Sequence, residues 1–359
     1  MTKIIALYLP QFHPIKENDE WWGDGFTEWV NVAKARPRFP GHQQPNIPGE
    51  LGFYDLRIPE VREHQVKLAK EAEVTGFMYW HYWYGGKELL ERPFKEVVES
   101  GKPDFPFCLG WANHSWYKKN WSSDKGKDKL LIEQTYPGEQ DHIDHFYSLL
   151  SAFKDKRYIK VSGKLLFHIY LPSDIPNVEG FLKLWRRLAK ENNISDFYFI
   201  GQNNTVESEE ILQLGFDATY DARLMRVHDD NFILWKMIKR LIANIFRCGV
   251  LYKYSNAMKH FNNEENKLND RIAGLYTNYD HSPRSRHRGY ILYGYKPKLF
   301  YKHVLDTLNL IKSKKEENKI LLLQSWNEWG EGNYLEPDRK WGKQFIHAMR
   351  DAINDFNNQ

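Results

Sequence analysis

Short apolar runs alternate with longer amphipathic stretches along this chain, and the alternation predicts its fold. Eight runs are interpreted as strands, at residues 4–9, 76–84, 106–113, 165–171, 197–202, 216–220, 273–276 and just after Lys319. Helical patterns follow each run, near residues 59–72, 89–98, 145–153, 181–191, 298–314 and 341–353, with a short one after residue 204. Strands that alternate with helices predict a parallel sheet, and eight such units predict a closed (β/α)8 TIM barrel. An open doubly wound sheet is the alternative, but no G-x-G-x-x-G turn follows the first run.

Two long connections interrupt the regular pattern, so we expect a single barrel domain over residues 1–359 with insertions after the first and sixth strands. The first, residues 10–55, carries Trp21, Trp22, Trp29 and several prolines, and a long aromatic loop of this kind is usually functional. The second, residues 222–271, contains a basic amphipathic helix at about 232–246. This helix either packs against the barrel or makes peripheral contact with an anionic membrane surface.

Composition excludes several classes of protein. The 359 residues include 51 basic and 47 acidic side chains, well interspersed, for a net charge of +4, so no nucleic-acid partner is expected. Two cysteines, Cys108 and Cys248, make no disulfide framework. The apolar run at the N-terminus is too short for a signal peptide, and no stretch approaches the ~20 apolar residues of a membrane span. These features predict a cytoplasmic protein.

Aromatic residues make up 15% of the chain, which is unusually many. Several stand where a predicted strand ends, as in Trp111-Ala112-Asn113 and Trp326-Asn327-Glu328-Trp329. The carboxyl ends of barrel strands meet at one mouth, where active sites of this fold lie. Aromatic rings with amide and hydroxyl groups fit a sugar substrate. The predicted substrate-binding residues are Tyr8, His13, Trp29, His81, Tyr82, Trp111, Asn113, Tyr170, Gln202, Asn278, Asp280, Trp326 and Asn327.

Glu328 and Glu331 are the candidate catalytic residues. They follow the eighth apolar run, among three aromatic rings, and a pair of carboxylates is what glycoside hydrolysis requires. The plainer interpretation is that both are solvated loop residues. The histidines show no metal-binding spacing and no G-x-S-x-G elbow occurs, so we expect neither a metal nor a cofactor.

The segment Arg284-Ser285-Arg286-His287-Arg288 lies just past the seventh strand. Two interpretations stay open for this basic cluster. It is either a solvated loop or a site for an acidic group, such as a phosphate or a uronic carboxylate.

Five motifs identify a resemblance: residues 7–14 (LYLPQFHP), 25–29 (GFTEW), 52–55 (GFYD), 111–113 (WAN) and 326–332 (WNEWGEG). The chain resembles the WbsX-type proteins of bacterial surface-polysaccharide gene clusters, which are similar to glycoside hydrolase family 99, the endo-α-mannosidases. The resemblance runs from Tyr8 to Pro337. It implies a TIM barrel and a retaining, metal-free mechanism. In that mechanism Glu328 acts as a base on the substrate 2-hydroxyl, giving a 1,2-anhydro sugar, and Glu331 is the general acid/base.

This chain departs from the WbsX pattern at two places in one loop. His114 stands where an acidic residue is common, and Trp121-Ser122-Ser123 replaces a frequent Trp-Asp-Gly. The leading hypothesis is a retaining glycoside hydrolase, mannosidase-like and endo-acting, that acts on an α-linked surface-polysaccharide or O-antigen glycan. One alternative is a glycosyltransferase of lipopolysaccharide or capsule biosynthesis, although the chain has no D-x-D motif or nucleotide-binding turn. The other is an inactive glycan-binding barrel.

Overall fold

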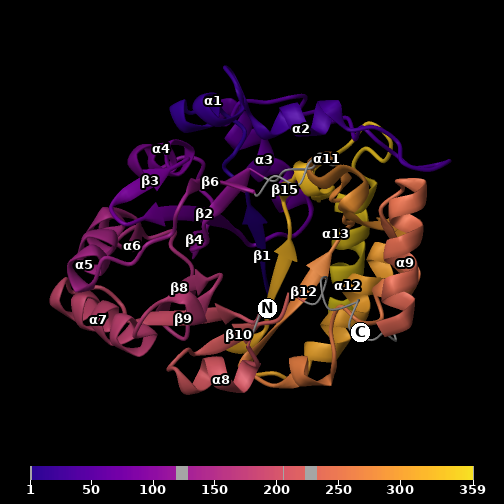
Figure 1. The fold of residues 1–359 in the computed structure, drawn as a ribbon. Coiled ribbons are helices and arrows are strands. Elements are labelled where there is room, and N and C mark those ends of the chain that lie inside the picture. Colours follow the sequence, from indigo (N-terminus) through magenta and orange to yellow (C-terminus); the bar gives the residue numbers. More distant parts are fainter. Residues whose placement is uncertain (1, 119–127, 205, 223–232, 359) are drawn as a thin grey trace.

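Eight parallel strands close into a barrel, as predicted. The computed structural model describes residues 2–118, 128–204, 206–222 and 233–358 (Figure 1). The barrel strands are β1 (Lys3–Tyr8), β2 (Gly76–Tyr84), β4 (Phe107–Trp111), β8 (Lys164–Ile169), β9 (Phe197–Gln202), β10 (Ala218–Tyr220), β12 (Arg271–Tyr276) and β14 (Ile320–Gln324). Each pairs in parallel with its neighbours, and β1 pairs with both β2 and β14, which closes the ring.

Helices surround the barrel on the outside (Figure 1). They are α3 (Pro59–Glu71), α4 (Arg92–Ser100), α5 (Glu139–Ser148), α6 (Leu150–Phe153), α7 (Val178–Glu191), α8 (Ser208–Gln213), α12 (Pro297–Ile311) and α13 (Gln344–Asn357). The helix predicted at 89–98 begins only at residue 92, because β3 (Lys87–Leu89) pairs with the end of β2 in antiparallel register. The smaller elements are β5 (Trp116–Lys118), β6 (Lys129–Ile132), β7 (Lys160–Val161), η1 (Pro172–Asp174) and η5 (Glu316–Asn318).

Helix α7 illustrates how the sequence fixes these helices. Asn177 precedes it, and its side chain accepts a hydrogen bond from the Gly180 amide at 3.3 Å, which caps the first turn. Apolar residues spaced at three and four positions, including Phe181, Trp185 and Leu188, are buried against the barrel. The Trp185 ring contacts several phenylalanine rings of α5, α6, β8 and β9. Much of the aromatic content is therefore core.

The first long connection is not structureless, which corrects the expectation of an irregular loop. It contains two seven-residue helices, α1 (Lys16–Trp22) and α2 (Glu28–Lys34). Both lie on the same side of the barrel as α11 (Ser282–Ser285) and β15 (Asn327–Glu328) (Figure 1). Trp29 of α2 packs against Trp329, with ring centroids 5.5 Å apart. The connection is thus tied to the segment that follows β14.

The second insertion contains α9 (Ile233–Phe246), β11 (Val250–Lys253), α10 (Tyr254–Ala257) and η3 (Glu264–Lys267). Strand β11 pairs in parallel with β13 (Tyr290–Tyr293), which follows α11 and η4 (Arg286–Arg288). The predicted basic helix is therefore present, although Phe232 lies outside the described residues. In the described parts of the chain, every helix is too short or too polar to cross a lipid bilayer.

Candidate active site

A cleft of about 750 Å³ opens at the carboxyl ends of the barrel strands. This volume is in the range of small-ligand sites. Aromatic rings form much of its wall and are joined by acidic and basic side chains. The aromatic members are Trp22, Phe26, Trp80, Tyr82, Trp116, Tyr117 and Tyr170. The charged and imidazole members are Glu28, Lys34, Arg38, His114, His281, Arg284, Arg286, Glu328 and Glu331.

Glu328 and Glu331 both line this cleft. Glu328 ends β15, and Glu331 ends the short turn η6 (Trp329–Glu331), which leads into β16 (Asn333–Tyr334). One arginine bridges them: Arg284 Nη2 lies 2.7 Å from Glu328 Oε1, and Arg284 Nη1 lies 2.6 Å from Glu331 Oε1. Because both carboxylates bind adjacent nitrogens of one planar group, they face the same space.

A third carboxylate, Glu28, belongs to the same cluster. It is the first residue of α2, is buried, and accepts a hydrogen bond from Arg284 Nε at 2.9 Å. A Cβ atom at Gly330 would lie 1.9 Å from Glu28 Oε1, so only glycine at that position lets Glu28 approach. We call Glu28, Glu328 and Glu331 with Arg284 the carboxylate cluster. Glu28 belongs to the motif at residues 25–29, which indicated the family resemblance. The motif alone did not indicate that Glu28 is part of the candidate active site.

The two candidate catalytic carboxyl groups differ in their affinity for a proton. Burial raises the pKa of Glu328 to about 8, although Arg284 opposes the shift. Burial also acts to raise the pKa of Glu331, but Arg284 and His281 outweigh it and lower that pKa to about 2. His281 Nε2 lies 3.5 Å from Glu331 Oε1. Glu328 is therefore the more basic member of the coupled pair, and it holds a proton more readily than Glu331 in the free site.

Asn327 fixes the segment that carries these carboxylates. Its Oδ1 accepts a hydrogen bond from the Leu9 amide at 2.7 Å, and its Nδ2 donates to the Leu9 carbonyl at 3.0 Å. Asn327 is fully buried, so neither group can exchange its partner for water. The segment after β14 is thereby held against the end of β1.

Replacing Asn327 by alanine should destabilise the fold. The buried Leu9 amide and carbonyl would both lose their partner, at ~1–3 kcal/mol for each unsatisfied group. We expect the free energy of unfolding, measured by urea denaturation, to fall by about 2–4 kcal/mol. Asn309→Ala, at a partly buried position of α12, removes one hydrogen bond, to the Leu305 carbonyl, and should cost much less. Equal losses in the two variants would contradict the role given to Asn327.

Of the predicted substrate-binding residues, Tyr82 and Tyr170 line the cleft. His114, the residue that departs from the WbsX pattern, lines it as well, 5.2 Å from the Tyr170 ring centroid. Burial lowers the pKa of His114, so its ring is neutral at pH 7. The other departure, Trp121-Ser122-Ser123, lies outside the described residues.

Most of the other predicted residues lie behind the cleft wall rather than in it. Side chains alternate along a strand, so a residue near a strand end can point outward into the helix layer. Trp111 and His81 contact His145 of α5, with His81 Nε2 2.8 Å from His145 Nε2. Asn113 holds both backbone groups of Leu171. Direct contact of these side chains with a ligand in the cleft is therefore not supported.

The hydroxyl group of Tyr8 belongs to a buried hydrogen-bond network and does not line the cleft. Its hydroxyl donates to Gln65 Oε1 at 2.7 Å, and Gln65 Nε2 donates to Glu336 Oε1 at 2.7 Å. Glu336 also accepts hydrogen bonds from Tyr54 and Trp329. Three more predicted residues are buried in the same region: His13, Trp29, whose Nε1 donates to the Tyr54 carbonyl, and Trp326, 5.3 Å from Phe77. All four are buried, and none of them lines the cleft.

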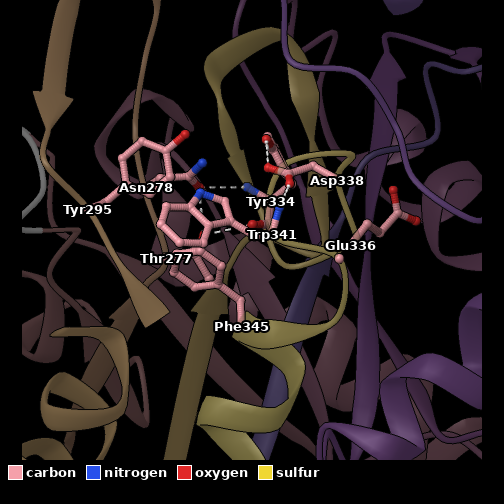
Figure 2. A pocket seen from close by; sticks show the side chains of 9 residues that line it. Thr277, Asn278, Tyr295, Tyr334, Glu336, Asp338, Trp341 and Phe345 are labelled. Carbon is pink, nitrogen blue, oxygen red and sulfur yellow. Dashed lines mark hydrogen bonds between the residues drawn. The ribbon is translucent and has the colours of Figure 1, made fainter. Parts of the chain in front are cut away.

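Asn278 faces a different cavity, of only about 10 Å³, between Tyr295, Tyr334 and Trp341 (Figure 2). Asn278 Oδ1 accepts hydrogen bonds from the Tyr334 amide at 3.2 Å and from the Thr277 hydroxyl at 2.8 Å. A space of this size has room for about one water molecule and not for a sugar. Asn278 therefore lines this small cavity and not the cleft, and its contact with substrate stays a prediction.

Asp280 and Gln202 do not line the cleft either, and both form hydrogen bonds with other residues of the protein. Asp280 Oδ2 lies 2.7 Å from His42 Nε2 and accepts a hydrogen bond from Gln44 at 2.5 Å, while Oδ1 accepts one from the Ser282 amide. These partners outweigh the effect of burial and lower the pKa of Asp280. Gln202 donates to Asn204 Oδ1. Asp280 thus fixes α11, from which Arg284 reaches the carboxylate cluster.

Among the described residues, histidine, cysteine, aspartate and glutamate side chains form no group of three or more that could hold a metal ion.

Comparisons with known proteins bear on the fold and the family. The protein named "Uncharacterized protein WxcX" from Xanthomonas campestris pv. campestris (strain B100) is 31% identical over 98% of this chain. The match covers 49% of that relative, so the chain spans about half the length of the curated relatives it matches.

Two solved structures share the fold over nearly the whole chain. A "Glycoside hydrolase-like protein" superposes with a TM-score of 0.59 and 14% identity, covering 98% of this chain and 93% of that one. The GH99 endo-alpha-mannosidase from Bacteroides thetaiotaomicron superposes with a TM-score of 0.54 and 14% identity, covering 99% and 97%. The family model described as "Glycosyltransferase WbsX" matches residues 4–349. The chain therefore belongs to the WbsX family.

Proposed function

We propose that this protein is a retaining glycoside hydrolase that cleaves an α-linked glycan of a bacterial surface polysaccharide. The observation that carries the proposal is the carboxylate pair Glu328 and Glu331, held by Arg284 in an aromatic-lined cleft at the end of the eighth barrel strand. The WbsX family assignment and the fold shared with a GH99 endo-alpha-mannosidase support it. Aromatic rings and a pair of carboxyl groups are the features such a reaction needs.

The proposed reaction has two steps. In the first, Glu328 accepts the proton of the sugar 2-hydroxyl, whose oxygen attacks the anomeric carbon. The bond to the leaving group breaks as Glu331 donates a proton to the departing oxygen. In the second, Glu331 takes a proton from water, which opens the 1,2-anhydro ring, and Glu328 returns its proton to the 2-oxygen.

The protonation of the free site is the reverse of what the first step requires. Glu331 has to carry the proton, whereas Arg284 and His281 keep it ionised in the unliganded protein. Glu331 is nevertheless the more open of the two, with 23% of its side chain exposed against 11% for Glu328. A leaving-group oxygen therefore reaches Glu331 more readily. We propose that the proton passes to Glu331 when a glycan loosens its contact with Arg284.

The family description favours a second candidate, glycosyl transfer from a nucleotide sugar. The two functions are separated by incubating the protein with α-linked oligosaccharides and by titrating it calorimetrically with UDP- and GDP-sugars. Hydrolysis is expected to release shorter oligosaccharides in the absence of nucleotide. Tight binding of a nucleotide sugar without any hydrolysis would replace the proposal by glycosyl transfer.

We also propose that α9 rests on an anionic lipid surface. Several of its described apolar side chains face solvent: Phe246 is 71% exposed, Ile245 is 65% exposed, and Leu241 is 60% exposed. Ala243, on the other side, is buried against the protein, and α9 packs on β11 and η4. The helix carries basic residues and no acidic ones. An exposed apolar face with basic flanks is complementary to anionic lipid.

The membrane proposal predicts that Leu241→Gln/Ile245→Gln loses most of the binding to vesicles of phosphatidylcholine and phosphatidylglycerol, measured by co-sedimentation. Each lost apolar side chain removes ~1–2 kcal/mol of burial, or about tenfold in partition. Leu130→Gln/Leu268→Gln changes two leucines exposed elsewhere and should bind normally. Absence of wild-type binding contradicts the proposal, as does self-association that the α9 variant abolishes.

A further inference from the structure

The cleft has a basic edge that the proposed reaction does not use. Lys34 at the end of α2, Arg38 in the loop that follows, and Arg286 of η4 all line the cleft that holds the carboxylate cluster. We call these three residues the basic edge. They come from two parts of the chain about 250 residues apart, so it is the fold that gathers them and not a local run of charge.

Within the described ranges, no carboxylate neutralises the charges of the basic edge. Arg284, only two residues before Arg286, is surrounded by three carboxylates. In contrast, Lys34, Arg38 and Arg286 form no ion pair with any described acidic residue. The acidic group that faces Arg38 is Asp280, and its carboxylate is already engaged by His42, Gln44 and the Ser282 amide.

Among the three residues of the basic edge, Arg38 shows the lack of a partner most clearly. Its side chain is half-buried, and its Nε–H is enclosed without a hydrogen-bond partner among the described residues. Burial lowers the pKa of Arg38, and repulsion from Arg286, Arg247 and Arg36 lowers it further. A buried guanidinium donor without an acceptor costs free energy that an incoming oxyanion would recover.

Arg286 supports the same conclusion by its position. It is exposed and lines the cleft, so its guanidinium group is accessible to a ligand there. The alternative, a solvated basic loop, leaves the enclosed Arg38 donor unexplained.

We propose that the basic edge binds a negatively charged group of the substrate, a phosphate or a carboxylate, on a sugar next to the one that meets Glu328 and Glu331. The inference rests on the proposed function and narrows it to an acidic glycan. Guanidinium groups bind oxyanions through paired N–H donors, and Lys34 adds a third positive charge. Arg284 neutralises part of the carboxylate cluster, so an anionic substrate meets less repulsion there.

The test measures binding of three probes by tryptophan fluorescence, since Trp22 and Trp116 line the cleft. The probes are inorganic phosphate, glucuronic acid and neutral glucose, each at low and at high salt. We expect the wild-type protein to bind one or both anions more tightly than glucose, and more weakly at high salt. Phosphate binding alone identifies a phosphorylated substrate, and glucuronic acid binding alone identifies a uronic acid.

The test variant is Arg38→Gln/Arg286→Gln, which should weaken anion binding by about 10- to 100-fold and leave glucose binding unchanged. The control Arg187→Gln/Arg350→Gln removes the same net charge from exposed positions of α7 and α13, neither of which lines the cleft. It should bind the anions as tightly as the wild type does. The single variant Arg286→Gln, at an exposed residue, carries the same test if the double variant is unstable.

Two results would overturn the inference: equal binding of charged and neutral probes by the wild type, or equal loss in the control. The proposed function fails separately. Glu331→Gln should keep anion binding while it loses glycan cleavage. If the wild type binds anions but cleaves no glycan, the hydrolase proposal fails and the proposal of an anion-binding subsite stands. If it cleaves neutral glycans but binds no anion, the subsite proposal fails and the hydrolase proposal stands.

Discussion

Glu331→Gln and Glu328→Gln should each lower the turnover of a cleavable glycan by about 10²- to 10⁴-fold, the contribution typical of a positioned acid or base. Glutamine keeps the size and the acceptor oxygen of each side chain but cannot exchange a proton. Both variants should still fold, because Arg284 retains the other carboxylates of the cluster. The measurement is the initial rate of product release. Turnover within tenfold of wild type in both variants would remove the pair from the mechanism.

The leaving group distinguishes the two roles. A substrate with an activated aryl leaving group needs no proton as it departs, so it should restore the first step of Glu331→Gln and not that of Glu328→Gln. The reverse pattern would make Glu328 the acid, in agreement with its higher pKa in the free site. Glu179→Gln, an exposed residue of α7, should leave both substrates unaffected.

The pH dependence follows from the same pair. Burial raises the pKa of Glu328 to about 8, so the pair loses its remaining proton as the pH rises past that value. We expect kcat/KM to fall on this alkaline side, because no carboxyl group then carries the proton that the leaving group needs. The fall should be absent for Glu331→Gln on the activated substrate.

The strands could be predicted from sequence because each is a short apolar run with a clear boundary. The run at residues 76–84 matches β2, and the run at 197–202 matches β9. Helices α1 and α2 could not be predicted in the same way. Each has only seven residues, and neither has a side-chain hydrogen bond at its N-cap. Short helices of this kind owe their stability to packing on the rest of the fold.

The candidate site could be predicted only where its residues are adjacent in sequence. Glu328 and Glu331 stand three residues apart beside aromatic rings, which made the pair visible. Glu28 and Arg284 are 256 residues apart, and nothing local indicates that they meet at 2.9 Å. Trp111 illustrates the opposite error: it ends a barrel strand, but its ring points away from the cleft and packs on Phe181 and His145. Nearness to a strand end does not specify the direction of a side chain.

Arg284→Gln should have the second large effect, on stability as well as on activity. The change leaves Glu28, Glu328 and Glu331 close together in a largely buried site without their shared cation. Removing one partner of a buried charge pair costs ~3–5 kcal/mol, and urea denaturation at pH 7.5 should show a loss of that order. Arg284→Lys keeps the positive charge but cannot donate to all three carboxylates in the same way. Its loss of stability should therefore be smaller than that of Arg284→Gln.

The sign of the pH effect identifies the cause. Without Arg284 the carboxyl groups repel one another, and their pKa values in the folded state rise above those of the unfolded chain. The folded state then binds more protons, so the variant loses stability as the pH rises from about 4.5 towards 8. In the wild type Glu331 acts in the opposite sense: its lowered pKa contributes stability above about 4.5 that is lost as the pH falls towards 2. Arg284→Gln should therefore be closer to wild type at pH 5 than at pH 7.5. An equal loss at both pH values would mean that Arg284 acts through packing alone.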